Sequence, residues 1–369
     1  MLVYVHVPFC ARRCSYCDFA IAVRRDTPSD GFADAILREW DERHDSPAVA
    51  AGPDAIETVY FGGGTPSRLD PRALERILVG LAGRRTIGSG AEVTLEANPD
   101  DVTRARATAW RQLGINRVSL GVQSFNPGVL AWMHRTHTAG QSAEAVGVLR
   151  AAGIGNLSID LIYGVPADLG RVWDADLEEA LALMPDHLSF YALTVETGTP
   201  LGKWTARREA TPLADDVVAG EYLRTHLRLG EAGFQHYEVS NAALPGRRAV
   251  HNSGYWEGRP FLGLGPSAAS GAGRWRSWNL REWEAWRREL AAGRPVVAGE
   301  EWLTDRQAAI EGQYLGLRTD RGLPAAQIPP GQARTWREAG WATETGGRLR
   351  LTAEGWLRLD ALVASLPVP

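Results

Sequence analysis

The sequence predicts an α/β protein built as a (β/α)6 partial TIM barrel, followed by a small, mostly helical, winged-helix-like domain. Three observations predict this fold. Short runs rich in β-branched residues recur, helical patterns separate them, and polar motifs stand where the runs end. We expect the barrel to span residues 1–240, a connecting segment to span 241–300, and the C-terminal domain to span 301–369.

Six strands are expected, and their alternation with helices implies a parallel sheet. Asp70 before Pro71 marks a helix start, and Gly114 and Gly153 follow helical patterns as glycines at helix C-termini do. The expected strands are LVYVHV (2–7), TVYF (58–61), EVTLEA (92–97), RVSLGV (117–122), NLSIDLIY (156–163) and HLSFYAL (187–193).

The second half has a different character. Residues 202–216 are polar and are expected to form a loop, residues 217–234 a helix, and QHYEVSN (235–241) a strand at the sheet edge. Towards the C-terminus, Gly346-Gly347 predicts a hairpin turn. A final helix is expected to start at Thr352.

The composition is that of an ordinary globular protein, with 44% hydrophobic and 23% charged residues. A net charge of −4 gives no electrostatic basis for nucleic-acid binding. The chain lacks an apolar run of about 18 residues, so we expect no membrane span, although peripheral membrane contact is compatible with the sequence. The first residues do not resemble a signal peptide, and the expected location is the cytoplasm.

The three cysteines of the chain, Cys10, Cys14 and Cys17, lie within eight positions. Three cysteines cannot all pair in disulfides. Structural zinc takes four ligands, and a Cys3His site that uses His6 is one alternative. An iron–sulfur cube takes four thiolates, so three would leave one iron open to a small molecule.

Further polar positions fall at the carboxyl ends of the expected strands, where barrel enzymes have their sites. Gly62-Gly63-Gly64-Thr65-Pro66 follows the second strand, and glycine lets the backbone approach a ligand closely. The third to sixth strands carry, in turn, Glu96, Gln123, Asp160 and Ala192.

The C-x3-C-x2-C spacing resembles that of the radical S-adenosylmethionine (SAM) proteins. The resemblance implies a [4Fe–4S] cluster whose open iron chelates the methionine amine and carboxylate of SAM. It implies that Gly63, Gly64 and Thr65 approach the methionine amine, and that Glu96, Gln123 and Asp160 bind ribose hydroxyls or the amine. Arg135 would grip the methionine carboxylate in a bidentate fork. Tyr4 would lie beside the cluster and SAM, and Phe19 and Ala192 would shield the cluster and support the adenine.

The sequence around the cysteines, YVHVPFC…C…CDF, more specifically resembles the subgroup that contains oxygen-independent coproporphyrinogen III oxidase and the HemW-type haem chaperones. His251-Asn252-x-x-Tyr255-Trp256 resembles the HNxxYW motif of these chaperones. His251 is therefore either a contact to haem or a structural residue at the barrel end. Ala269 departs from the pattern, since many relatives have histidine there.

Two departures favour the chaperone over the oxidase. Phe19 stands where the oxidase usually has a fourth cysteine, and the long N-terminal arm expected of the oxidase is absent from this sequence. The expected function is therefore to bind the cluster, SAM and haem, and to pass haem to apo-haemoproteins. Coproporphyrinogen III dehydrogenase activity and another radical SAM reaction, such as methyl transfer, are the alternatives, so enzyme activity stays open.

Overall fold

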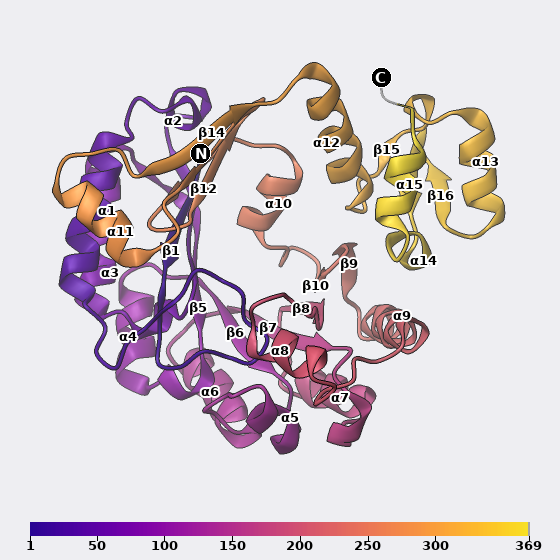
Figure 1. Ribbon diagram of the computed structural model, residues 1–369, viewed down its shortest axis with the longest axis horizontal. Helices are drawn as coiled ribbons and strands as arrows, with labels where there is room; N and C mark the ends of the chain where they lie inside the picture. The colour runs from indigo at the N-terminus through magenta and orange to yellow at the C-terminus, as the bar shows by residue number, and fades with distance from the viewer. Residues whose placement is uncertain (368–369) are drawn as a thin grey trace.

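The computed structural model describes residues 1–367, which form a long curved sheet, a layer of helices outside it and a small C-terminal unit (Figure 1). The strands are β1 (Leu2–Val7), β2 (Phe9–Cys10), β3 (Ala22–Val23), β4 (Ile56–Gly63), β5 (Ile87–Ala97), β6 (Arg117–Gln123), β7 (Asn156–Tyr163), β8 (His187–Ala192), β9 (Gln235–Glu238), β10 (Asn241–Ala243), β11 (Phe261–Leu264), β12 (Ala269–Ala272), β13 (Trp275–Asn279), β14 (Val297–Trp302), β15 (Leu323–Pro324), β16 (Ala342–Thr345) and β17 (Arg348–Leu351).

The helices alternate with the parallel strands and continue into the C-terminal unit. They are α1 (Ser29–Glu42), α2 (Pro47–Ala51), α3 (Pro71–Arg84), α4 (Arg104–Gln112), α5 (Pro127–Trp132), α6 (Ala139–Ala151), α7 (Trp173–Ala182), α8 (Pro200–Ala206), α9 (Asp215–Glu231), α10 (Val250–Trp256), α11 (Trp283–Ala291), α12 (Asp305–Leu317), α13 (Pro330–Glu338), α14 (Ala353–Trp356) and α15 (Leu359–Ser365). None of the described helices is long and apolar enough to cross a membrane.

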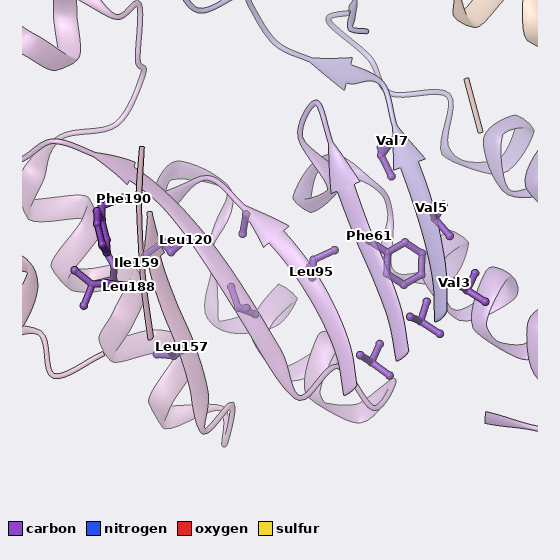
Figure 2. Packing of buried hydrophobic residues seen from close by; sticks show 14 of the residues in the cluster. Val3, Val5, Val7, Phe61, Leu95, Leu120, Leu157, Ile159, Leu188 and Phe190 are labelled. Carbon is purple, nitrogen blue, oxygen red and sulfur yellow. The ribbon is translucent and has the colours of Figure 1, made fainter. Parts of the chain in front are cut away.

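The six expected strands are confirmed as the parallel series β1-β4-β5-β6-β7-β8. Their side chains alternate between two faces, as strand geometry requires. Val3, Val5 and Val7 of β1 lie on the face that packs against the helices, together with apolar residues of the other strands (Figure 2). The opposite face carries polar residues and lines the barrel interior.

Local sequence signals fix several element ends. Asp70 accepts a hydrogen bond from the Arg72 amide at 2.8 Å and begins α3, as expected. Gly114 and Gly153 have φ of 88° and 85°, the left-handed conformation that favours glycine. The Gly346-Gly347 turn joins β16 to β17, with φ of 60° and 71°.

Two local expectations are wrong. Residues 202–206, expected in a loop, belong to α8, because Thr199 caps the helix by accepting from the Gly202 amide and Pro200 fits its first position. The helix expected from Thr352 is divided into α14 and α15. Trp356, at the end of α14, donates through Nε1 to the Leu317 carbonyl, so packing on α12 sets the direction of the first segment.

The segment 241–300 adds strands to both edges of the barrel sheet. β10 pairs with β8 at one edge, and β9, expected at the sheet edge, pairs with β10. At the other edge β11 pairs with β1 and leads into β12, β13 and β14. The chain between β10 and β11 must cross the open side of the partial barrel, and it does so through α10 (Figure 1).

The C-terminal unit contains α12 to α15 and a three-stranded antiparallel sheet in the order β15-β17-β16, beside α9 in Figure 1. Helices followed by a hairpin agree with the winged-helix-like arrangement expected for this part. The domain boundaries at 240/241 and 300/301 stay predictions.

Candidate cofactor site at the barrel rim

A cavity of about 430 Å³, here called the rim pocket, opens at the carboxyl ends of the parallel strands. The structure brings most of the predicted site residues to its wall. Those that line it are Cys10, Cys14, Cys17, Phe19, Gly63, Gly64, Thr65, Glu96, Gln123, Arg135, Asp160 and Ala192.

The cysteine loop is folded back over the rim. Short strands β2 and β3 pair, which brings Cys10 into the core, while Cys14 and Cys17 are half-buried in a turn closed by the Cys17 amide and the Cys14 carbonyl at 3.3 Å. Burial raises the pKa of Cys10 to about 11. The thiol is therefore protonated in the absence of metal, and binding iron requires loss of that proton.

Two groups near the sulfurs favour thiolates. Thr65 Oγ1 donates to Cys10 Sγ at 3.4 Å, and Arg135 Nη1 lies 3.6 Å from Cys14 Sγ. Three free cysteines that line one pocket, with a hydroxyl and a guanidinium beside them, match the donor set of a [4Fe–4S] cluster with one open iron.

The zinc alternative finds less support. His6 would supply the fourth ligand, but Nδ1 is hydrogen-bonded to the Tyr4 hydroxyl at 3.0 Å and Nε2 to the Ala20 carbonyl at 2.9 Å. The residues therefore fit a cluster held by three thiolates better than a Cys3His zinc ion.

The glycine motif after β4 is tightly packed against the cysteine loop. Gly63 has φ of 112°, and a Cβ there would lie 2.6 Å from the His6 ring. A Cβ on Gly64 would lie 2.8 Å from the Pro8 carbonyl oxygen and 3.0 Å from Cys10 Sγ. Only glycine fits at these two positions, and the motif thereby lets the backbone reach the pocket wall.

Two carboxylates, on β5 and β7, line the pocket from the barrel interior. Glu96 accepts from the Tyr60 hydroxyl and from the Gly63 amide, both at 2.9 Å, and burial raises its pKa to about 7. Asp160 accepts from Ser119 at 2.8 Å and from Ser158 at 3.2 Å, and burial raises its pKa as well. Both carboxylates gain from a ligand hydroxyl or ammonium group, because such a donor favours the charged form.

Gln123 and Arg135 line the same pocket. Gln123 has φ of 68°, a strained conformation for a residue with a side chain, at the irregular pairing of β6 with β7. Arg135 Nη2 donates to Asn98 Oδ1 and to the Gly121 carbonyl, each at 2.7 Å. The expected bidentate grip on a carboxylate would require Nη2 to release one of these acceptors, whereas Nε is buried and without a partner in the described structure.

Tyr4 and His251 lie outside the rim pocket wall. The Tyr4 hydroxyl is hydrogen-bonded to His6 Nδ1 at 3.0 Å. His251 is 1% exposed, with Nδ1 hydrogen-bonded to Thr58 Oγ1 at 2.6 Å and Nε2 to the Tyr255 hydroxyl at 2.7 Å. Burial lowers the pKa of His251 to about 3, so the ring is neutral. In this conformation His251 holds α10 to the barrel, and a bond from His251 to haem iron would need one of these partners to leave.

Sequence reasoning missed several residues of the pocket wall. Strand alternation could have found Arg117 and Ser119 of β6 and Ser189 of β8, because they share the inward face with Gln123 and Tyr191. Asn98 follows β5 directly and orients Arg135. Asn252, which reaches the pocket from α10, belongs to the HNxxYW motif but was given no role there.

Comparison with known proteins agrees with this geometry. The sequence profile of the radical SAM superfamily matches residues 4–184. A heme chaperone HemW of Mycobacterium tuberculosis is 38% identical, over 99% of this chain and 94% of that protein. The chain belongs to the HemW family of radical SAM proteins. Its cofactors are accordingly a [4Fe–4S] cluster and SAM, and the cysteines of the rim pocket fit that cluster.

Other relatives extend the comparison. The heme chaperone HemW of Synechocystis is 35% identical over 88% of this chain and 80% of that protein. Among solved structures, coproporphyrinogen III oxidase (HemN) from Escherichia coli, a radical SAM enzyme, superposes with a TM-score of 0.81. That match covers 98% of this chain and 89% of the oxidase at 21% identity, so it establishes the fold and not the activity.

Proposed function

We propose that this chain is a haem chaperone: it binds haem and transfers it to apo-haemoproteins, with a [4Fe–4S] cluster and SAM bound at the barrel rim. The observation that carries the proposal is 38% identity to a heme chaperone over 99% of the chain. The cytoplasmic location and the acceptor haemoproteins stay predictions.

In this proposal the residues of the rim pocket bind and orient the cofactors. Cys10, Cys14 and Cys17 hold the cluster, which supplies an open iron and an electron when bound. Gly63 and Gly64 allow the backbone to approach the methionine part of SAM. Glu96 and Asp160 accept hydrogen bonds from its hydroxyl or ammonium groups.

The other predicted residues of the rim pocket have supporting roles. Gln123 donates to the ribose, Thr65 supports Cys10, and Ala192 and Phe19 cover the adenine and the cluster. Arg135 Nη1 lies 3.6 Å from Cys14 Sγ, so the guanidinium neutralises part of the negative charge on the thiolates. A contact between Arg135 and the methionine carboxylate would use Nη1 or Nε.

The oxidase is the second candidate, because the fold of the Escherichia coli enzyme covers 98% of this chain. Phe19 argues against it. The side chain that stands where the oxidase usually has cysteine lines the rim pocket and is 63% exposed. A phenyl ring offers no ligand to iron, so the cluster at this rim has three protein thiolates.

One reconstituted sample tests the two candidates together. The protein, anaerobically loaded with cluster and SAM and given a reductant, should retain haem on a desalting column and pass it to an apo-haemoprotein. It should not convert coproporphyrinogen III to protoporphyrinogen IX. Conversion with turnover, in the absence of haem retention, would establish the oxidase and overturn the chaperone.

A further inference from the structure

A second cavity of about 530 Å³, here called the side cavity, lies between β1, α10, β12, β13 and α12. Its volume is within the range of about 300–1,000 Å³ that ligand pockets occupy. Its walls come from segments more than 300 residues apart in the chain, since Tyr4 and Leu315 both line it. Of its lining residues, only Asp18 and Phe19 also line the rim pocket.

The wall of the side cavity combines aromatic rings with arginines. Phe19, Tyr255, Trp256 and Phe261 line it, and Tyr255 packs edge-on against Phe261 with ring centroids 4.7 Å apart. The Arg318 guanidinium lies 4.2 Å over the Trp256 ring. Flat apolar molecules bind to surfaces of this kind, because aromatic side chains offer large apolar area in defined orientations.

Three arginines, Arg259, Arg276 and Arg281, line the same cavity, against two carboxylates, Asp18 and Glu311. Arg259 pairs with Glu57 and Arg276 with Glu311. Arg281 donates to the Asp18 carbonyl at 2.5 Å and has no carboxylate within salt-bridge distance in the described part of the chain. The lining thus has an excess of positive charge, and Arg281 is available to an anionic group of a ligand.

Helix α10, which carries the HNxxYW motif, has a buried histidine in its first turn and ends with two residues in the wall of the side cavity. His251 at its start is buried and bonded to Thr58 and Tyr255, while Tyr255 and Trp256 at its end line the side cavity. The residues of the motif that line the side cavity are therefore its aromatic residues, whereas Asn252 lines the rim pocket. The histidine fixes the helix that presents them.

The side cavity also adjoins the rim pocket. Asp18 and Phe19 line both, directly after the last cluster cysteine. Gly63 lines the rim pocket and His6 lines the side cavity, and a Cβ on Gly63 would lie only 2.6 Å from the His6 ring. These two residues therefore form part of a thin wall between the two cavities, here called the partition. A molecule in the side cavity would therefore lie next to the cofactors without occupying their pocket.

We propose that the side cavity is the site where haem is carried, with the porphyrin against Tyr255, Trp256, Phe261 and Phe19 and a propionate paired with Arg281. Haem matches the wall because it is flat and apolar with two anionic carboxylates. The proposal rests on the proposed function, since it places the cargo of the chaperone.

A variant that adds an iron ligand to the side cavity tests whether haem binds there. Ala269 is exposed and lines the side cavity, on β12. His6, which also lines it, has both ring nitrogens hydrogen-bonded. An Ala269→His variant therefore offers a new imidazole to iron, and bound haem should shift its Soret band and become more low-spin. Ala292→His, at an exposed alanine after α11, is the matched control and should leave the spectrum of the unchanged protein.

Removing the positive charge of Arg281 is the second test of the haem site. Arg281→Ala should weaken haem affinity about 3- to 10-fold, because a charge-assisted contact at a partly exposed site is removed. Arg287→Ala, an exposed arginine of α11 that pairs with Glu284, should not change it. The measurement is a titration of the holo-protein with haem, followed by absorption.

The results of these experiments distinguish a failure of the proposed haem site from a failure of the proposed chaperone function. If the unchanged protein retains no haem, the proposed function fails. If it retains haem, but Ala269→His gives an unaltered spectrum and Arg281→Ala an unaltered affinity, the chaperone stands and haem lies elsewhere. A spectral shift from Ala269→His that Ala292→His does not share supports the side cavity.

Discussion

The rim pocket and the side cavity adjoin one another, yet they are built in different ways. The rim pocket collects polar groups from strand ends and from the loops that follow them, mostly from the first 200 residues. The side cavity is assembled from β1, the Asp18–Phe19 segment, α10, three strands of the extended sheet and α12. Both linings contain arginines and aromatic rings, but the three cysteines line the rim pocket alone, whereas the side cavity has no thiol and includes Trp256 and Phe261. This difference agrees with the proposal that the rim pocket binds the polar cofactors and that the side cavity binds haem.

The cysteines should give the largest difference between the two cavities. Replacing Cys10, Cys14 or Cys17 by serine should abolish the EPR signal of the reduced cluster after anaerobic reconstitution, because two thiolates cannot hold the cube. Haem affinity should change less than about 2-fold, since no cysteine lines the side cavity. Loss of haem in parallel with the cluster would show that one site serves both ligands.

Gly63 lies in the partition, and its replacement should affect both cavities. In Gly63→Ala the new Cβ would meet the His6 ring at 2.6 Å, at a φ of 112°. We expect the free energy of unfolding to fall by about 1–3 kcal/mol, with weaker binding of both SAM and haem.

Gly147→Ala is the matched control for that variant. Gly147 is in the exposed interior of α6, where a Cβ meets nothing within 4 Å. Stability there should rise by about 0.5–1 kcal/mol. Chemical denaturation measures both variants, and a Gly63→Ala protein as stable as the starting protein would contradict the tight partition.

Asp160 should affect the rim pocket alone. Asp160→Asn keeps the shape but removes the charge that Ser119 and Ser158 support. SAM affinity should fall about 10-fold, the scale of one hydrogen bond to a charged group, and haem affinity should stay the same. Calorimetric titration with SAM measures the change, with Asp216→Asn on exposed α9 as control. Unchanged SAM affinity would mean that Asp160 is not part of the SAM site.

His251 should have the smallest effect on ligands and a measurable effect on stability. His251→Gln disturbs the bonds to Thr58 and Tyr255, each of which contributes about 0.5–1.5 kcal/mol to the free energy of unfolding. Haem should still be retained, because the ring does not line the side cavity. A haem spectrum that changes in His251→Gln would instead favour His251 as a ligand.

The same histidine makes stability depend on pH. Its pKa is lowered from 6.5 to about 3 by burial, so the unfolded chain binds the proton more readily than the folded one. The stability that the neutral ring contributes is present above pH 6.5 and is lost as the pH falls towards 3. Stability measured from pH 7 downwards should therefore fall less steeply in His251→Gln. Equal slopes would contradict the buried neutral ring.

Much of the rim pocket could be predicted because its determinants are local. The cysteine spacing, the glycines at 62–64 and the position of Glu96, Gln123 and Asp160 at strand ends are visible in the chain. In a parallel barrel all carboxyl ends of the strands meet at one rim, so a correct strand assignment also gathers these residues in space. Arg135 shows the limit of this reasoning. Its position was predicted, but its hydrogen bonds to Asn98 and Gly121 depend on how three loops meet.

The sequence by itself determined the parallel barrel and its cysteine loop, because strand periodicity and close spacing act over a few residues, and the resemblance of the cysteine motif implied the family. Only the tertiary structure decided that the segment 241–300 extends the sheet at both edges and that α10 closes the open side. It also decided that His251 is bonded internally while Tyr255 and Trp256 face the side cavity. These features depend on contacts between residues far apart in the chain, such as Thr58 with His251, and no local pattern encodes which distant partner a side chain will meet.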